Sequence, residues 1–180
     1  MSGGLTRRSA IAVAAVTVSS CGGGQDPPSG RGARPGSGVG VLNSVLALEH
    51  ASLAAYAALA ERLARPERSR VQEIVEQERE HVRRLSDLIE GLGGTPVAGR
   101  ATRDYAPSFP RLRDAGDALL LAHDIEERQV RAYLEALVKL PAGPLRRSAA
   151  ALATSEAEHL ALVQGLRGEQ MAQAAFVTGT

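Results

Sequence analysis

Cysteine is nearly absent from this sequence, since Cys21 is the only one among 180 residues. A disulfide framework is therefore excluded, and so is a metal site built from several thiolates. Tryptophan is missing and aromatic residues make up only 3% of the chain. Alanine, leucine, arginine and glutamate are abundant instead, and these residues favour helices. The composition thus indicates an all-α protein.

An excess of charge of either sign is also missing. The chain has 21 basic and 20 acidic residues, which gives a formal net charge of +1. A nucleic-acid-binding domain typically shows a basic patch or stripe, so we expect no nucleic acid among the partners. A length of 180 residues allows one domain with a substantial core, together with tails.

The N-terminal segment has the pattern of an export signal. Arg7 and Arg8 precede an apolar run over residues 10–18, which is shorter than the roughly 20 residues that span a bilayer. This pattern resembles a Tat signal, and residues 18–21 resemble a lipobox ending at Cys21. We therefore expect residues 1–21 to be a signal peptide, with a lipidated Cys21 that anchors the protein at the outer face of the cytoplasmic membrane. A signal without lipid is the alternative.

The remaining chain divides by composition and periodicity. Residues 22–40 are rich in glycine, proline and serine and predict a disordered tether. Residues 41–168 show helical apolar periodicity, and residues 169–180 form a short tail. Prolines and glycines divide the periodic region into four predicted helices. They span about residues 41–63, 67–90, 114–140 and 145–167, and a long connection over residues 91–113 joins the second to the third.

One short pattern occurs twice, as Glu78-x-x-His81 and Glu156-x-x-His159. A spacing of three residues puts both side chains on one face of a helix. In each copy that face is the apolar one, which predicts that both groups are buried. Burying an unpaired charge costs several kcal/mol, and a bound metal ion removes this cost. A single copy on a helix is more often a solvated pair, but two copies indicate a metal site.

Each half of the chain adds one isolated glutamate within an apolar stripe, Glu49 in the first helix and Glu126 in the third. These two residues are 77 positions apart, and the two Glu-x-x-His patterns are 78 apart. The chain is therefore an internal repeat of a helical hairpin. At 1.5 Å per residue, all six side chains lie at roughly 17–21 Å from their turns, which is one level of a bundle.

One glutamate from each of two helices, together with Glu-x-x-His from each of the other two, is the di-iron carboxylate arrangement of four-helix bundles. On these residues, the sequence resembles the ferritin-like superfamily over about residues 41–167, in particular its bacterioferritin and rubrerythrin branches. The resemblance implies a ferritin-like antiparallel four-helix bundle of two hairpins joined by one long crossover. It also implies two iron (or manganese) ions with bridging Glu78 and Glu156, terminal Glu49 and Glu126, and one histidine on each ion, His81 and His159.

Other polar residues have less certain roles. Tyr56 stands two turns after Glu49, where ferritins often have a tyrosine beside the site, so it is either a redox residue or a core aromatic, as is Tyr133. His123 precedes Glu126 by three residues, and we consider it an additional ligand, a partner of a ligand or a packed histidine. Three further residues are expected to be solvated or to lie at the rim: Glu80, Glu158 and His50.

Two functions are consistent with this pattern. The first is a di-metal oxidoreductase in which Fe(II) reacts with O₂ or peroxide, as the ferritin-like resemblance implies. The second is a metal-free or metal-structural module that mediates contacts in the cell envelope. Oxygen and nitrogen ligands suit iron and manganese alike, so the sequence does not distinguish them. A homodimer is compatible with either function.

Overall fold

The structure, a computed structural model, describes residues 38–169. The predicted signal peptide, Cys21 and most of the tether lie outside these residues. Within them every regular element is a helix, which confirms the all-α prediction. The elements are α1 (Gly38–Leu59), the 3₁₀ turn η1 (Ala60–Arg62), α2 (Arg65–Gly91), α3 (Thr102–Tyr105), the 3₁₀ turn η2 (Ala106–Ser108), α4 (Ala115–Lys139) and α5 (Pro144–Leu166).

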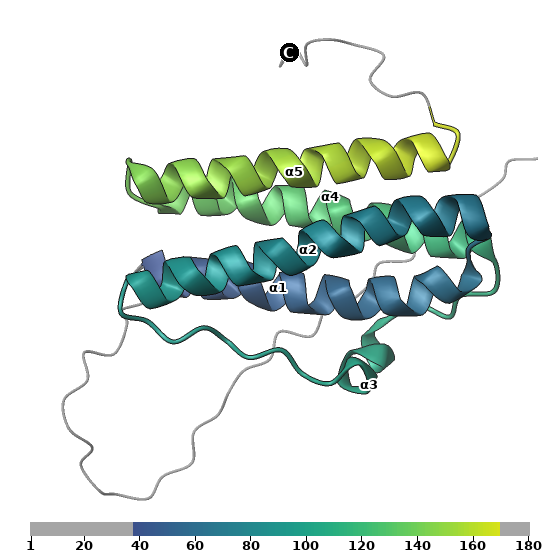
Figure 1. Cartoon of the computed structure of the whole chain (residues 1–180), viewed down its shortest axis with the longest axis horizontal. Coiled ribbons are helices and arrows are strands. Elements are labelled where there is room, and N and C mark those ends of the chain that lie inside the picture. The colour runs from purple at the N-terminus through teal and green to yellow at the C-terminus, as the bar shows by residue number, and fades with distance from the viewer. Residues whose placement is uncertain (1–37, 170–180) are drawn as a thin grey trace, which may run out of the picture. The chain divides into compact units, whose positions relative to one another are not determined.

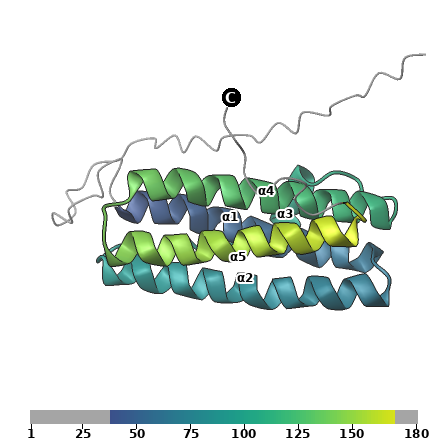
Figure 2. The same ribbon diagram turned by 90° about the horizontal axis from the view of Figure 1, so that it is seen from above.

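The four long helices form an antiparallel bundle of two hairpins (Figures 1 and 2). α1 packs against α2 and α4, and α5 packs against α4 and α2. The connection from α2 to α4 runs along the length of the bundle beside α1, so α4 begins at the end where α2 also begins (Figure 1). The long crossover expected from the sequence is therefore present.

The helix boundaries follow from residues that start or stop helices. Pro66 and Pro144 lie in the first turns of α2 and α5, where a missing N–H is tolerated. Asp114 caps α4, because its side chain accepts a hydrogen bond from the N–H of Asp117 at 2.9 Å. Gly143 ends the α4–α5 turn at φ 129°, a conformation that favours glycine. These signals explain why the predicted helices match the observed ones to within a few residues.

The crossover is more structured than the sequence pattern predicts. It contains the single turn of α3 followed by η2, where the composition indicates only a connection. Tyr105 lies at the end of α3 with 6% of its surface exposed, and its hydroxyl accepts a hydrogen bond from the N–H of Arg100 at 3.0 Å. The segment that contains the buried Tyr105 packs against α1, and this packing holds the crossover on the bundle. The proline-rich sequence pattern does not predict this contact.

A polar layer divides the apolar core of the bundle. One apolar cluster includes Leu59, Ile74 and Ala122, and the other includes Leu46, Leu85 and Leu152. Between them lie eight buried polar or charged residues from the four long helices: Glu49, Ser52, Glu78, His81, Glu126, Gln129, Glu156 and His159. The fold thus buries an ionisable layer halfway along the helices, and the apolar clusters on both sides separate it from water.

Candidate metal centre

The bundle brings together all six residues that the repeated pattern singled out. None of them has more than 4% of its surface exposed. The first hairpin contributes one half of the set from α1 and α2, and the second contributes the other half from α4 and α5. The residues are Glu49, Glu78, His81, Glu126, Glu156 and His159.

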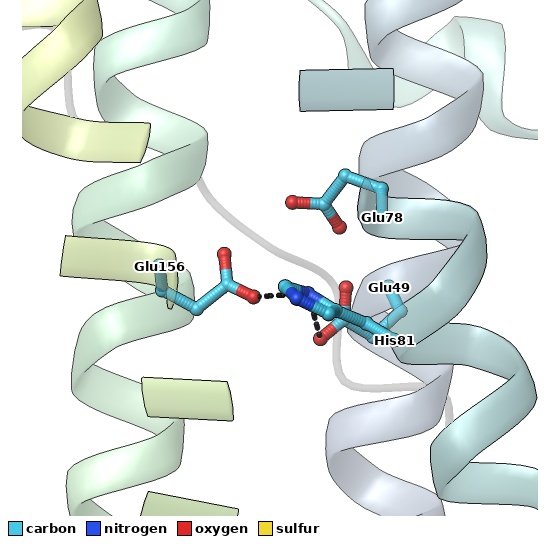
Figure 3. A group of neighbouring side chains, drawn as sticks. All are labelled: Glu49, Glu78, His81 and Glu156. Carbon is cyan, nitrogen blue, oxygen red and sulfur yellow. Dashed lines mark ion pairs between the residues drawn. The ribbon is translucent and has the colours of Figure 1, made fainter. Parts of the chain in front are cut away.

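These residues form two overlapping clusters, each with four ligand atoms that lie within 4.8 Å of one another. The first cluster combines Glu78 and Glu156 with Glu49 and His81, as Figure 3 shows. The second combines the same two glutamates with Glu126 and His159. Two sites that share two carboxylates have the layout of a di-metal centre with bridging glutamates.

Both histidines turn Nδ1 toward the carboxylates. His81 Nδ1 lies 2.6 Å from Glu156 Oε1, so α2 and α5 meet across the centre (Figure 3). His159 Nδ1 lies 3.2 Å from Glu78 Oε1 and 3.6 Å from Glu126 Oε2. Each imidazole therefore has a carboxylate of the opposite hairpin as its nearest one, Glu156 for His81 and Glu78 for His159.

The other ring nitrogens meet two polar residues that the sequence analysis missed. His159 Nε2 lies 3.0 Å from Gln77 Oε1, and His81 Nε2 lies 3.2 Å from Ser155 Oγ. Ser155 Oγ in turn donates to Gln77 Oε1 at 3.3 Å. An amide oxygen only accepts, so this network assigns a proton to both Nε2 atoms and leaves both Nδ1 atoms available to a metal. The sequence does contain a feature that could have identified these two residues, because Gln77 and Ser155 each precede the glutamate of a Glu-x-x-His pattern.

Two tyrosines connect the halves of the centre crosswise. The Tyr56 hydroxyl on α1 donates to Glu126 Oε1 on α4, and the Tyr133 hydroxyl on α4 donates to Glu49 Oε1 on α1. Burial, followed by the neighbouring carboxylates, raises the pKa of both phenols well above the usual value. Both tyrosines therefore remain protonated donors, and both contact a carboxylate of the centre.

Ser52 and Gln129 complete the layer, and the sequence analysis missed both. The Gln129 amide donates from Nε2 to Glu49 Oε2 at 3.1 Å and to Glu78 Oε2 at 3.0 Å. Ser52 Oγ donates to Glu78 Oε2 at 3.0 Å. The available signal is position, because each follows an isolated glutamate by three residues and so shares its helix face.

Burial and the neighbouring charged groups together shift the pKa values of the centre. It raises the pKa of Glu49 well above the usual value, with help from the neighbouring Glu78, and raises the pKa of Glu126 to about 8. Burial also acts to raise the pKa of Glu78, but hydrogen bonds from Glu49 and His159 outweigh it and lower this pKa to about 2. Burial acts to lower the pKa of His159, yet the carboxylates of Glu126, Glu156 and Glu78 close to its Nδ1 raise it to about 11.

The donor atoms of the centre fit a divalent metal. Of the six residues, five have buried ligand atoms without a hydrogen-bond partner: Glu78 Oε1, Glu126 Oε2, both oxygens of Glu156, His81 Nδ1 and His159 Nδ1. Each unsatisfied buried polar atom costs about 1–3 kcal/mol. Carboxylate oxygens and imidazole nitrogens are ligands of iron, manganese and zinc, so a metal removes this cost.

Other residues considered in the sequence analysis stay outside the centre. His123 is half-buried, and its Nδ1 lies 3.9 Å from Asp124 in a separate group with the exposed Glu127. His123 and Gln129 lie about 60° to opposite sides of Glu126 on the helix, and the Gln129 side is the one that faces the centre. Glu80 and Glu158 are exposed, and the half-buried His50 hydrogen-bonds to the crossover, as expected of solvated or rim positions.

A cavity of about 520 Å³ lies between α1, α2 and the crossover. Its walls include Tyr56 together with His50, Arg79 and Arg100. Because the hydroxyl of Tyr56 contacts Glu126, the Tyr56 side chain lies between this cavity and the centre.

An antiparallel four-helix bundle with a buried layer of carboxylates and histidines defines a ferritin-like protein. The chain belongs to the ferritin-like domain family, and the match covers residues 37–169. It is similar to the crystal structure of a conserved hypothetical protein, rv2844, from Mycobacterium tuberculosis. The TM-score is 0.64 at 21% sequence identity, over 78% of this chain and 96% of that chain, and this likeness shows the fold. No curated protein matches the chain.

Proposed function

We propose that this protein binds two iron or manganese ions in the middle of its bundle and acts as an oxidoreductase on Fe(II) with O₂ or peroxide. The observation that supports the proposal is the pair of overlapping four-residue clusters, whose ligand atoms include buried oxygens and nitrogens without partners. The ferritin-like resemblance implies two ions with two bridging glutamates, and this arrangement accounts for the overlap of the two clusters. Membership of the ferritin-like domain family gives independent support.

The proposed assignment of ligands follows the two clusters. Glu49 and His81 hold one ion, and Glu126 and His159 hold the other, while Glu78 and Glu156 are shared. When bound, the ions supply one-electron redox chemistry to an otherwise redox-inert site.

The protein's own residues orient the side chains that would bind the ions and accept the protons that leave them. Tyr56 and Tyr133 hold one oxygen of each isolated glutamate, so the ligands do not rotate freely. Gln77 and Ser155 fix the rings of the two histidines through Nε2. A proton leaving His159 Nδ1 has the buried carboxylates of Glu78 and Glu126 as its nearest acceptors, at 3.2 Å and 3.6 Å.

Metal content and melting temperature of the full chain test the proposal. After anaerobic loading with Fe(II) or Mn(II) and removal of excess metal, we expect close to two ions per chain. We also expect a higher melting temperature than without metal, because the ions bind only the assembled site and relieve repulsion among four carboxylates. Oxygen or peroxide consumption by the Fe(II)-loaded chain then tests the oxidoreductase activity.

A matched pair of variants makes the result specific. Glu78→Ala removes a shared ligand and should abolish most of the metal content and the melting-temperature difference. Glu80→Ala removes an exposed glutamate on the same helix and should leave both unchanged. A metal ratio near zero in the wild type, with equal melting temperatures, would reject the di-metal centre and favour the metal-free envelope module.

A further inference from the structure

The two halves of the metal centre are not equivalent, because the repeat places different polar side chains at one buried position beside the isolated glutamates. The residue three places after the isolated glutamate is Ser52 in the first hairpin and Gln129 in the second. Both side chains are buried, with exposed fractions of 2% and 0%. The tyrosines are matched in the two halves, so this position distinguishes the surroundings of Glu49 from those of Glu126.

The orientation of the Gln129 amide is fixed by chemistry. Its Nε2 lies within hydrogen-bond distance of Glu49 Oε2, Glu78 Oε2 and Ser52 Oγ, at 3.0–3.3 Å. A carboxylate that holds a metal ion is ionised and only accepts hydrogen bonds, so in the metal-loaded centre the nitrogen and not the oxygen of the amide must face Glu49 and Glu78. Gln129 Oε1 has no hydrogen-bond partner among the described residues, so the amide is held through its nitrogen alone.

As a result, Glu49 and Glu126 differ in the oxygens that they offer to a metal. Glu49 accepts hydrogen bonds at both oxygens, from Tyr133 at Oε1 and from Gln129 at Oε2. Glu126 accepts one from Tyr56 at Oε1, and its Oε2 has no hydrogen-bond partner. An ion beside Glu49 competes with an amide donor for the carboxylate, whereas an ion beside Glu126 meets a free oxygen.

The metal position at His159 therefore offers more ligand atoms without hydrogen-bond partners than the position at His81. There the imidazole Nδ1 and one oxygen from each of three glutamates are buried without hydrogen-bond partners: Glu78 Oε1, Glu126 Oε2 and Glu156 Oε2. At the His81 position, Glu49 offers no such oxygen.

We infer that Gln129 makes the two metal positions unequal, so that the position at His159 fills first and the position at His81 fills second and more weakly. This inference rests on the proposed di-metal function, and it identifies Gln129 as a positioning residue that acts through Glu49.

Titration of the full, metal-free chain with Co(II) tests the order of filling. Calorimetry gives the two dissociation constants, and visible absorption reports the ligand set at each step. We expect two separate steps in the wild type. His81→Ala should retain the tighter step and lose the weaker one, whereas His159→Ala should lose the tighter one.

A second variant tests the cause. Gln129→Met keeps a similar volume but removes the amide donor, so the dissociation constant of the weaker step should fall by about tenfold, equivalent to about 1.4 kcal/mol. Because Gln129 also donates to the shared Glu78, the tighter step should change in the same direction but by less. Gln72→Met, a change of the same kind at an exposed position of α2, should alter neither step.

The outcomes separate this inference from the proposed function. Absence of any Co(II) binding in the wild type would overturn the proposed function. Two bound ions with equal affinities, loss of the tighter step in His81→Ala, or weaker second binding in Gln129→Met would overturn the inference alone. If circular dichroism shows that Gln129→Met does not fold, the order of loss in the two histidine variants still decides the question.

Discussion

Glu49, Glu78 and Glu126 have the same chemistry but different protonation, because their neighbours differ. Burial acts to raise the pKa of Glu78, but Glu49 and His159, whose Nδ1 lies 3.2 Å away, lower it to about 2. Glu49 and Glu126 are desolvated beside other carboxylates, and their pKa values are raised. The metal-free centre therefore stores protons that a divalent metal must displace.

Stability of the metal-free protein should fall as the pH rises from about 5 to about 8. The pKa of Glu126 is about 8 in the folded protein against 4.5 as the ordinary value, so the folded state binds more protons in this window. Each such group lowers the free energy of unfolding by up to about 1.4 kcal/mol per pH unit. Glu49 acts in the same direction, and so does His159, whose pKa of about 11 makes its contribution decline above about pH 6.5.

Urea unfolding at pH 5 and pH 8 in the presence of a chelator measures this effect. Glu126→Gln should reduce the slope by about 1 kcal/mol per pH unit, because the amide does not titrate. Below about pH 4.5 the trend should reverse, since the stabilising charge of Glu78 is lost as the pH falls toward 2. A metal-free protein that becomes more stable between pH 5 and pH 8 would contradict the prediction.

At the scale of elements, the crossover is the segment whose position depends on a few polar contacts. Asn43 on α1 accepts from the N–H of Val97 at 2.6 Å and donates to the carbonyl of Thr95 at 3.0 Å. His50, two turns further along α1, hydrogen-bonds through Nε2 to the carbonyl of Val97 at 3.2 Å. Gly99 permits the close approach, because a Cβ there would lie 2.8 Å from His50 Nδ1.

Asn43→Ala should release this part of the crossover without unfolding the bundle. Two hydrogen bonds to exposed backbone groups together contribute about 1–3 kcal/mol, so the free energy of unfolding should drop by about that amount or less. The amide of Val97 should exchange with deuterium faster, as hydrogen-exchange measurements can show.

Asn43→Asp is the matched control, because a carboxylate still accepts from Val97 but no longer donates to Thr95. It should leave the Val97 amide more protected than Asn43→Ala does. Equal exchange rates in wild type and Asn43→Ala would show that the asparagine does not hold the crossover.

At the scale of the whole molecule, the bundle belongs to a longer chain whose first 37 residues lie outside the described part. Their sequence motivates a proposal about location. Arg7 and Arg8, the short apolar run and the lone Cys21 together support export through a Tat-type route and lipidation at Cys21. One acyl chain alone gives marginal membrane binding, whereas the modified cysteine of bacterial lipoproteins has several.

Fractionation of cells that produce wild type or Cys21→Ala tests this proposal. The wild type should sediment with membranes, and Cys21→Ala should shift to the soluble fraction because it lacks the acceptor for lipid. Cys21→Ser serves as a second variant of closer size and should behave like Cys21→Ala. Equal distribution of all three between membrane and soluble fractions would exclude the lipid anchor.

The helices, the repeat and the burial of six glutamates and histidines could be predicted from the sequence, because periodicity and spacing on a helix fix which side chains share a face. Glu49 and Glu126 can be identified from the sequence alone, because each is a charged residue at a position of the apolar stripe of its helix. Only the tertiary structure revealed the contacts between hairpins, such as Tyr56 with Glu126 and Gln129 with Glu49. These contacts join residues 70 and 80 positions apart, and nothing in the local pattern encodes which atoms meet across the core.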